Sequence, residues 1–368
     1  MRYLVTGGCG FVGAAICRTL IESEAACEVV VLDNQRRRGV EINRVALERL
    51  GVQIVHGDVR MPSDIDDIGR CDWVIDAAAE PSVLAGATTS GPTTTRRHVI
   101  EHNLVGTANL LEAAARWHAG VVLLSSSRVY SIRPLTTLPL CTEQQAIGAT
   151  NVKAEAFVLD RAAALPPGVS ALGIDESFTT AAPISMYGAT KRASEVLAEE
   201  YSHTMGTPLV IDRCGVMAGA GQFGRADQGI FSWWIHSWAA GRPLSFIGFG
   251  GRGLQVRDCL HPRDLADLIL RQIAAARGGE PELVNVAGGI TSATSLAQLS
   301  AWCADRFGQR VVASASQPRP YDLPWIVLNH GEATARHGWN PQHSAAHIFD
   351  EIARHAERHP EWLDLCGG

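Results

Sequence analysis

The sequence of 368 residues has no apolar run that approaches the ~20 residues of a membrane-spanning helix. Its first apolar segment, Tyr3 to Val5, leads directly into Thr6-Gly7-Gly8 and is too short for a secretory signal. Basic residues are not in excess, because 32 Lys and Arg stand against 38 Asp and Glu and the formal net charge is -6. We therefore expect a cytoplasmic protein with no membrane partner and no basic face for nucleic acid.

The cysteines and histidines do not form a recognisable structural or metal site. The nine cysteines are odd in number and include no CxxC pair, so we expect reduced thiols rather than a disulfide framework. Near the C-terminus, four histidines occur as two i,i+4 pairs, a spacing that metal ligands can use. No Cys lies nearby and no acidic third ligand is clear. We predict a solvated helix and no metal for His343, His347, His355 and His359.

What the sequence does contain is an alternation of short β-rich runs with helical stretches in its N-terminal part. Strands are expected at 3–6, 28–33, 53–56, 73–77 and 120–125, and helices at 11–23 and 98–117. This alternation predicts an α/β fold, a Rossmann-like doubly wound parallel sheet with helices on both faces.

The rest of the chain is less regular. Residues 129–186 contain five prolines, and within them the Ala-, Glu- and Lys-rich segment 151–165 predicts a helix. Further helices are expected at 187–205, 262–276 and 295–307, with strands at 209–213 and 283–287. We expect a sheet domain of residues 1–215 and 257–285, and a smaller mixed α/β lobe of residues 216–256 and 286–368.

A glycine-rich turn follows the first strand and opens the first helix. Gly7, Gly10 and Gly13 are three residues apart, with Phe11 and Val12 between the last two. Glycines there allow a tight turn and the close approach of backbone amides to a pyrophosphate at a helix N-terminus. The context on both sides predicts a dinucleotide site.

The end of the second strand indicates which dinucleotide binds. Asp33 lies twenty residues after Gly13 and is followed by Asn34. A carboxylate here accepts hydrogen bonds from ribose hydroxyls and repels a 2'-phosphate, which favours NAD over NADP. The arginines at 36–38 are either a site for a 2'-phosphate or a solvated loop at the rim of the cofactor or substrate site.

Two further strand ends fit the same cofactor. Asp58 and Val59 follow the third strand, where an Asp can meet the adenine amino group. Ala77, Ala78 and Ala79 end the fourth, where small side chains let the backbone pass close to the pyrophosphate and ribose. Either segment alone is equally well explained as an ordinary strand end.

Tyr187 and Lys191 are four residues apart, so the predicted helix places a phenol and an ammonium on one of its faces. A nearby cation favours the tyrosinate form, which can act as a base. Ser125 and Ser126 end a predicted strand, at the edge where doubly wound sheets bind ligands. We choose Ser126 as the hydroxyl that shares a proton with Tyr187 and a substrate hydroxyl.

The glycine-rich turn, Asp33, the SSSRVY segment from Ser125 and the YGATK motif from Tyr187 together resemble the extended short-chain dehydrogenase/reductase superfamily, in its NAD-dependent nucleotide-sugar epimerase/dehydratase branch. The resemblance implies a catalytic trio of Ser126, Tyr187 and Lys191, with Ser125 also beside the cofactor. It implies that Asn103 supports the lysine through water. It further implies a nucleotide-diphosphate sugar as substrate and a homodimer.

Motifs in the second half of the chain resemble those of a smaller group within this family. The segments 221–223, 227–229, 248–251 and 255–261 are similar to those of family members that invert C2 of a CDP-linked deoxyhexose. Related 4-epimerases carry a similar Arg-Asp segment. By this resemblance Arg257 holds the nucleotide diphosphate, as suits a bidentate guanidinium. Gln228 either touches sugar or phosphate or is simply a polar residue at a helix start.

The residues after Ser126 bear on the reaction. Family dehydratases carry an Asp-Glu pair there, which supplies the additional acid and base needed to eliminate water. This chain has Ser127 and Arg128, which disfavours dehydration and decarboxylation and leaves both for substrate binding. We predict epimerisation through a transient ketone at C2 of a CDP-deoxyhexose. A 4-epimerase or a dehydrogenase is the nearest alternative, and a non-catalytic NAD-binding sensor is the alternative of another class.

Overall fold

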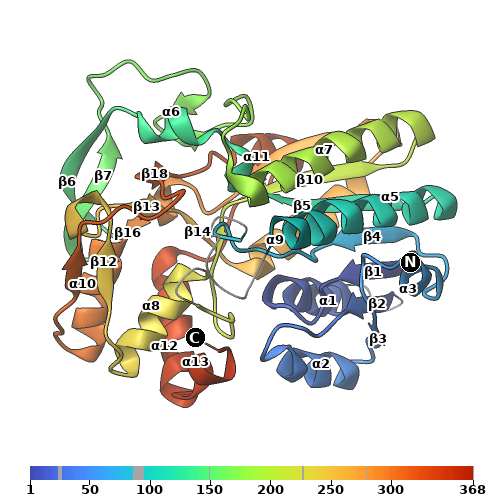
Figure 1. Cartoon of the computed structure of the whole chain (residues 1–368), viewed down its shortest axis with the longest axis horizontal. Coiled ribbons are helices and arrows are strands. Elements are labelled where there is room, and N and C mark those ends of the chain that lie inside the picture. The colour runs from blue at the N-terminus through green and yellow to red at the C-terminus, as the bar shows by residue number, and fades with distance from the viewer. Residues whose placement is uncertain (24–26, 86–94, 149, 226–227, 279, 368) are drawn as a thin grey trace.

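The computed structural model describes all of the chain except residues 24–26, 86–94, 149, 226–227, 279 and 368 (Figure 1). In this part of the chain the largest sheet has seven strands in the order β3-β2-β1-β4-β5-β10-β15, and all of its neighbouring pairs are parallel. Its strands are β1 (Arg2–Thr6), β2 (Glu28–Asp33), β3 (Gln53–His56), β4 (Trp73–Asp76), β5 (Gly120–Ser126), β10 (Leu209–Cys214) and β15 (Glu282–Val286). The predicted α/β, Rossmann-like fold is confirmed.

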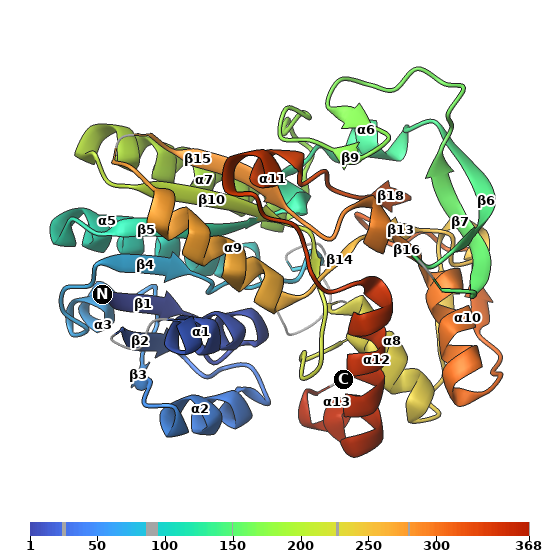
Figure 2. The same ribbon diagram turned by 180° about the vertical axis from the view of Figure 1, so that it is seen from behind.

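Helices cover both faces of this sheet, which explains why strands such as β2 and β5 are nearly continuous runs of apolar residues. Helices α1 and α9 lie on one face and α5 and α7 on the other (Figures 1 and 2). One apolar cluster joins the sheet to α1 and α9, and a second joins it to α5 and α7. The helices around the sheet are α1 (Phe11–Ser23), α2 (Val40–Arg49), α3 (Pro62–Asp66), α4 (Arg96–Ile100), α5 (Gly106–Trp117), α7 (Ser185–Met205), α9 (Pro262–Ala275) and α11 (Gly331–His337), with a π-helical turn, η1 (Glu101–Val105), between α4 and α5.

The second body of the molecule has its own apolar core around α8 (Ile230–Ala239), where Trp234 and Trp238 are buried. It also contains α10 (Leu296–Phe307), α12 (Ala345–Arg358), α13 (Trp362–Leu365) and the 3-10 turns η3 (Phe249–Gly251) and η4 (Ile290–Ser292). Its short strands pair as β11 (Val216–Met217) with β14 (Cys259–Leu260), β12 (Ser245–Ile247) with β17 (Ala313–Ala315), and β13 (Val256–Arg257) with β16 (Thr294–Ser295) and β18 (Trp325–Ile326).

The segment between β5 and α7 reaches across to this second body. It contains η2 (Ser127–Val129), α6 (Ile132–Thr136), the antiparallel pair β6 (Leu140–Ala146) and β7 (Lys153–Leu159), and the pair β8 (Val169–Ser170) and β9 (Gly173–Ile174). Phe178 of this segment and Trp325 belong to one buried apolar cluster. Figure 2 shows β6 and β7 beside α10 and β16, at the end of the molecule far from β1.

The helix predicted over 151–165 is wrong, because residues 153–159 form strand β7. Ala, Glu and Lys favour a helix locally, but hydrogen bonds from distant segments decide the outcome. On one edge β7 pairs with β6. Elsewhere along it, the Phe157 amide donates to the Leu254 carbonyl at 3.0 Å, and the Ser295 hydroxyl donates to the Glu155 carbonyl at 2.8 Å. Leu254 and Ser295 lie about 100 residues or more beyond β7 in the sequence. The residues next to β7 in the sequence therefore do not indicate that it forms a strand.

Candidate active site

A cavity of about 1050 Å³ lies between the carboxyl ends of the sheet strands and the second body. Parallel sheets bind ligands at this edge, where the strand order reverses beside β1 and β4. Of the predicted site residues only Asp58 and Asn103 lie off its wall. The others all line it: Gly7, Gly10, Phe11, Val12, Gly13, Asp33, Asn34, Val59, Ala77, Ala78, Ala79, Ser125, Ser126, Ser127, Arg128, Tyr187, Lys191, Gln228 and Arg257.

The glycine-rich turn forms a cradle that side chains would fill. A Cβ atom on Gly7 would lie 2.9 Å from Ala78 Cα, and Gly7 has a positive φ of 63°. A Cβ on Gly13 would lie 2.4 Å from the Gly7 carbonyl oxygen. The bare turn therefore exposes the N-terminus of α1 to the cavity, where a pyrophosphate fits.

Asp33 lies beside this cradle and is largely buried. Its carboxylate accepts hydrogen bonds from the Cys9 amide at 3.0 Å and from the Gln35 amide at 2.8 Å. Burial raises the pKa of Asp33 above its ordinary value, while these two amides act in the opposite direction. A fixed acceptor at this place suits ribose hydroxyls and disfavours a 2'-phosphate.

One of the nearby arginines, Arg37, forms a contact between the two bodies. Arg37 donates to the Phe223 carbonyl and, at 2.7 Å, to the Gln228 side-chain oxygen. Arg37, on the sheet side of the cavity, therefore holds the Gln228 side chain in place. The contact of Gln228 with sugar or phosphate stays a prediction. Asp227, from the same sequence motif, lies outside the described residues.

Asp58 and Asn103 are held by protein groups behind the wall. Asp58 accepts hydrogen bonds from Arg60 at 2.7 and 2.9 Å and from Asn34 at 3.1 Å. Burial acts to raise the pKa of Asp58, but the hydrogen bonds from Arg60 outweigh it and hold that pKa well below its usual range. Asn103 donates to the Glu80 carbonyl at 3.1 Å and to the Thr190 hydroxyl at 3.3 Å. Both predicted roles, adenine contact and lysine support, stay predictions.

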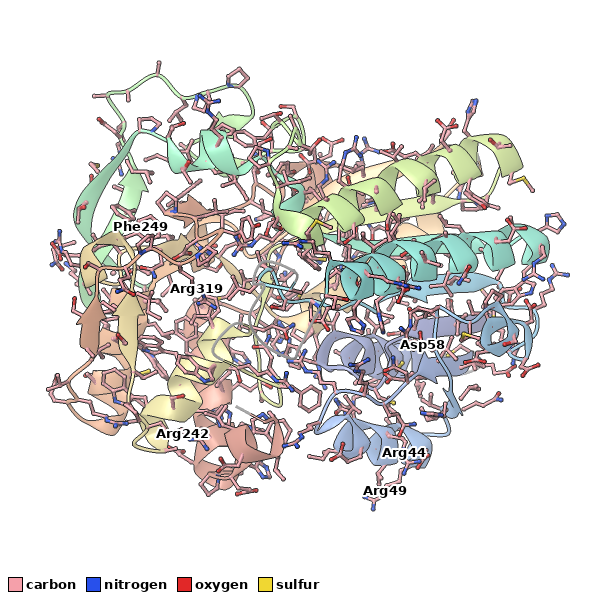
Figure 3. All side chains as sticks on the ribbon, viewed as in Figure 1. Arg44, Arg49, Asp58, Arg242, Phe249 and Arg319 are labelled. Carbon is pink, nitrogen blue, oxygen red and sulfur yellow. The ribbon has the colours of Figure 1, made fainter. Side chains whose placement is uncertain are left out.

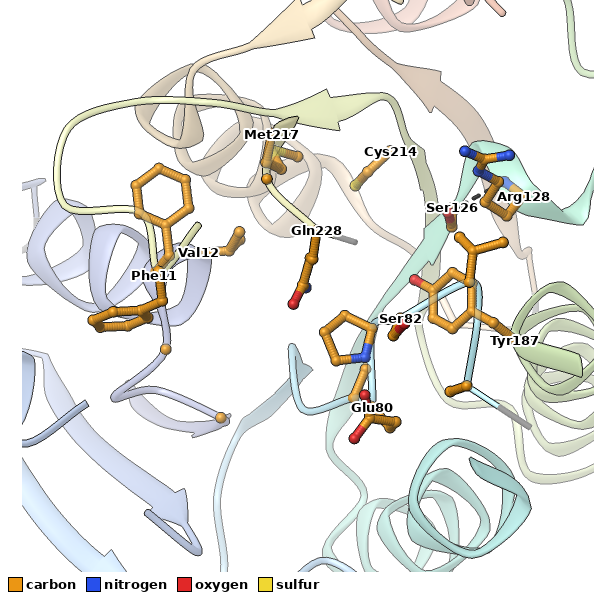
Figure 4. A pocket seen from close by; sticks show the side chains of 18 of the residues that line it. Phe11, Val12, Glu80, Ser82, Ser126, Arg128, Tyr187, Cys214, Met217 and Gln228 are labelled. Carbon is orange, nitrogen blue, oxygen red and sulfur yellow. Dashed lines mark hydrogen bonds between the residues drawn. The ribbon is translucent and has the colours of Figure 1, made fainter. Parts of the chain in front are cut away.

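The predicted catalytic residues meet on one side of the cavity. Tyr187 and Lys191 lie on the same face of α7, and the Lys191 ammonium donates to the Leu124 carbonyl of β5 at 2.8 Å. Ser126 ends β5, and its hydroxyl accepts a hydrogen bond from the Arg128 amide at 3.2 Å. Figure 4 shows Tyr187, Ser126 and Arg128 grouped together, opposite Phe11 and Val12.

Close packing brings α7 up to the segment after β5. A Cβ atom on Gly188 would lie 2.2 Å from the Arg128 carbonyl oxygen, a distance that real Cβ contacts do not show. Because Gly188 follows Tyr187 directly, the absence of its side chain sets the approach of Tyr187 to Ser126. This gives the glycine of the YGATK motif a structural reason.

We expect Gly188→Ala to lower kcat by about 100-fold, because a shift of about 1 Å between catalytic groups can have that effect. The measurement is steady-state turnover together with NAD content, which should stay at the wild-type level. The exposed neighbour Ala189 offers the control Ala189→Ser, which should behave as wild type. Full activity of Gly188→Ala would contradict the packing argument.

A group of charged residues from the second body lies beside Arg128 on the cavity wall. The group consists of Arg257, Arg319 and the carboxylate of Asp322. Figure 3 labels Arg319 among the elements of the second body. The Arg257 guanidinium donates to Asp322 at 2.9 Å and to two backbone carbonyls at 2.8 Å. Burial lowers the pKa of Arg128 to about 10, and the charge of Arg257 adds to this shift. A diphosphate suits such a surplus of positive charge.

Sequence reasoning missed Arg319 and Asp322, although both line the cavity. They lie more than sixty residues after Arg257 in a segment without a motif, so only the fold brings them to the site. Tyr321 lies between them with a positive φ of 58°, and its carbonyl accepts a hydrogen bond from Arg128 at 3.2 Å. An unusual backbone conformation of a bulky residue is a common feature of ligand sites.

The C-terminal histidines are not a solvated row, which corrects one expectation. His355 is buried against Trp362, and its Nδ1 atom lies 3.2 Å from Nε2 of His236. Burial lowers the pKa of His355 to about 4.

Among the described residues, no group of three or more His, Cys, Asp or Glu side chains is arranged to hold a metal ion. In the part of the chain that the structure describes, no helix is long and apolar enough to cross a membrane.

Comparison with known proteins agrees with this geometry. Residues 3–287 match the model of the NAD dependent epimerase/dehydratase family. The chain is 27% identical over 353 residues to CDP-paratose 2-epimerase of Salmonella typhi, covering 94% of this chain and 96% of that protein. It is 29% identical over 365 residues to dTDP-L-rhamnose 4-epimerase of Burkholderia thailandensis, covering 95% and 93%.

Solved structures show the same fold. The UDP-glucose 4-epimerase of Thermus thermophilus, in complex with NAD, superposes with a TM-score of 0.74 at 24% identity, covering 97% of this chain and 99% of that one. A UDP-glucuronic acid 4-epimerase mutant of Bacillus cereus, in complex with NAD and a fluorinated nucleotide sugar, gives a TM-score of 0.76 at 20% identity, with the same coverage.

Proposed function

Because the chain belongs to the NAD-dependent epimerase/dehydratase family, we propose that it inverts one carbon of a nucleotide-diphosphate sugar through a transient ketone. The chain is an enzyme of this family and its cofactor is NAD. One observation carries the proposal. The glycine-rich cradle, Ser126 and Tyr187 share one cavity, and Ser127 and Arg128 occupy the positions where dehydratases carry an acid pair.

The roles in the reaction follow from the placement of the side chains. Tyr187 accepts the proton of the sugar hydroxyl, and the Lys191 ammonium lies on the same face of α7. Ser126 donates a hydrogen bond to the same oxygen and stabilises its developing charge. NAD, when bound, would supply the hydride acceptor and donor, and inversion requires that the keto sugar turn in the cavity so that the hydride returns to the opposite face of the same carbon. Tyr187 then gives the proton back, so no net oxidation occurs.

We infer that the sugar is a CDP-linked deoxyhexose and that C2 is inverted. The motifs of segments 221–223 and 255–261 support this, as does the similarity to CDP-paratose 2-epimerase. Inversion at C4 is the second candidate, supported by the similarity to dTDP-L-rhamnose 4-epimerase. In both cases residues 1–215 and 257–285 form the NAD-binding domain and residues 216–256 and 286–368 form the nucleotide-sugar-binding lobe, with the catalytic residues and Arg257 at the boundary between the two. The proposal also includes the homodimer and the cytoplasmic location expected from the sequence.

The test is to incubate the purified protein with CDP-, UDP-, dTDP- and GDP-linked sugars in deuterated water and to locate inverted carbons by NMR. Direct hydride return leaves the inverted carbon without deuterium, which is the expected result. Deuterium at that carbon would indicate deprotonation next to a carbonyl and would contradict the mechanism. Inversion at C4 instead of C2 would overturn the assignment of the carbon alone.

The same panel tests the alternatives of net oxidation and of a silent sensor. Accumulation of NADH in step with product would identify a dehydrogenase. Tight NAD binding without turnover of any member of the panel would favour the sensor. Protein freed of NAD and then reloaded is the matched control, because only the reloaded sample should invert the sugar.

A further inference from the structure

A buried ion pair lies one helical turn beyond Lys191. Glu195 of α7 has no exposed surface, and the side chain of Arg213 on β10 is 4% exposed. Arg213 Nε donates to Glu195 Oε1 at 3.0 Å, and Arg213 Nη2 donates to Glu195 Oε2 at 2.8 Å. This bidentate geometry fixes both the distance and the orientation between α7 and β10.

The pair also reaches the strand that carries Ser126. The hydroxyl of Ser125, the preceding residue, donates to Glu195 Oε1 at 2.5 Å. Arg213 Nη1 donates to the Tyr130 hydroxyl at 3.4 Å, and the guanidinium lies over the Tyr130 ring at 5.2 Å. One carboxylate therefore connects α7, the end of β5, β10 and the segment that follows Ser126.

The energetics of such a pair indicate an orienting role. Burial acts to lower the pKa of Arg213, but the hydrogen bonds and charge of Glu195 outweigh it and raise that pKa above its ordinary value. Removing one partner leaves an uncompensated buried charge, whereas apolar residues of similar volume often replace both partners without loss of stability. Apolar side chains could thus fill the same space between α7 and β10. What only the ion pair supplies is a fixed distance and orientation between the two elements.

We propose that Glu195 and Arg213 are positioning residues that hold Tyr187 and Lys191 in register with Ser126 for proton and hydride transfer. The inference rests on the proposed epimerase function. Neither residue of the ion pair lines the cavity, so neither touches the reacting atoms. Their effect passes through Ser125 and through the axis of α7.

The test replaces both charges together, as Glu195→Met with Arg213→Met, in the full-length protein loaded with NAD. We expect a melting temperature and NAD content close to wild type, an unchanged KM, and kcat lower by about 100-fold, the effect of a misplacement of about 1 Å. A second readout is the isotope effect on kcat for substrate deuterated at the inverted carbon. It should rise above the wild-type value as hydride transfer becomes slower.

Arg116→Ala is the control, because Arg116 pairs with Asp66 at 2.5 Å on the surface and touches neither residue of the buried pair. It should keep the wild-type kcat and isotope effect. The inference is overturned if the double variant keeps wild-type kcat, or if its activity falls only in proportion to its folded, NAD-loaded fraction with the isotope effect unchanged. A wild-type protein that inverts no sugar would instead contradict the proposed function.

Discussion

Replacing Tyr187 with Phe should lower kcat by about 1000-fold, within the range that a positioned general base contributes. The ring stays in place, and only the hydroxyl that accepts and returns the substrate proton is removed. Because Tyr187 is largely buried on the cavity side of α7, the variant should fold and keep its NAD. The measurement is single-turnover inversion by protein with a determined NAD content, compared with the wild type.

The same helix offers a control for this change. Tyr201 lies fourteen residues further along α7, and its hydroxyl donates to Glu112 at 3.0 Å outside the cavity. Tyr201→Phe removes the same atom from the same element and should leave kcat unchanged. If Tyr187→Phe retained more than a tenth of wild-type turnover, another group would have to move the proton, and the assigned role of Tyr187 would be wrong.

Local motifs made much of the site predictable. A turn between β1 and α1 needs glycines within seven consecutive residues, and Tyr187 and Lys191 meet because a helix repeats every ~3.6 residues. The edge of a parallel sheet then brings these motifs to one place. Short-range geometry therefore made the fold class and many residues of the cavity wall predictable from the sequence.

Other parts depended on contacts between distant segments. Strand β7 is a strand because of its hydrogen bonds to β6, Leu254 and Ser295, against the helical preference of its own residues. Arg319 and Asp322 reach the site only once the second body has folded. The pairing of Glu195 with Arg213 requires α7 to lie on β10, since eighteen residues and a turn separate the two side chains.

The second large effect is expected at the cradle, where Gly13→Ala should release NAD. A Cβ on Gly13 would lie 2.4 Å from the Gly7 carbonyl oxygen and 2.7 Å from Gly8 Cα, so α1 must move away from the turn. Overpacking of this kind costs about 1–3 kcal/mol. Each 1.4 kcal/mol by which it destabilises the NAD-bound state weakens the affinity for NAD about tenfold. We expect NAD to bind about 10- to 100-fold more weakly, as measured by calorimetry on NAD-free protein.

A glycine away from the cavity separates this effect from general instability. Gly51 follows α2 with a φ of 84°, and a Cβ there would meet no atom within 4 Å. Gly51→Ala should lower the melting temperature through backbone strain of about 1 kcal/mol while leaving NAD affinity unchanged. If Gly13→Ala lowered stability to the same extent as Gly51→Ala but bound NAD as tightly as wild type, the turn would not be the pyrophosphate site.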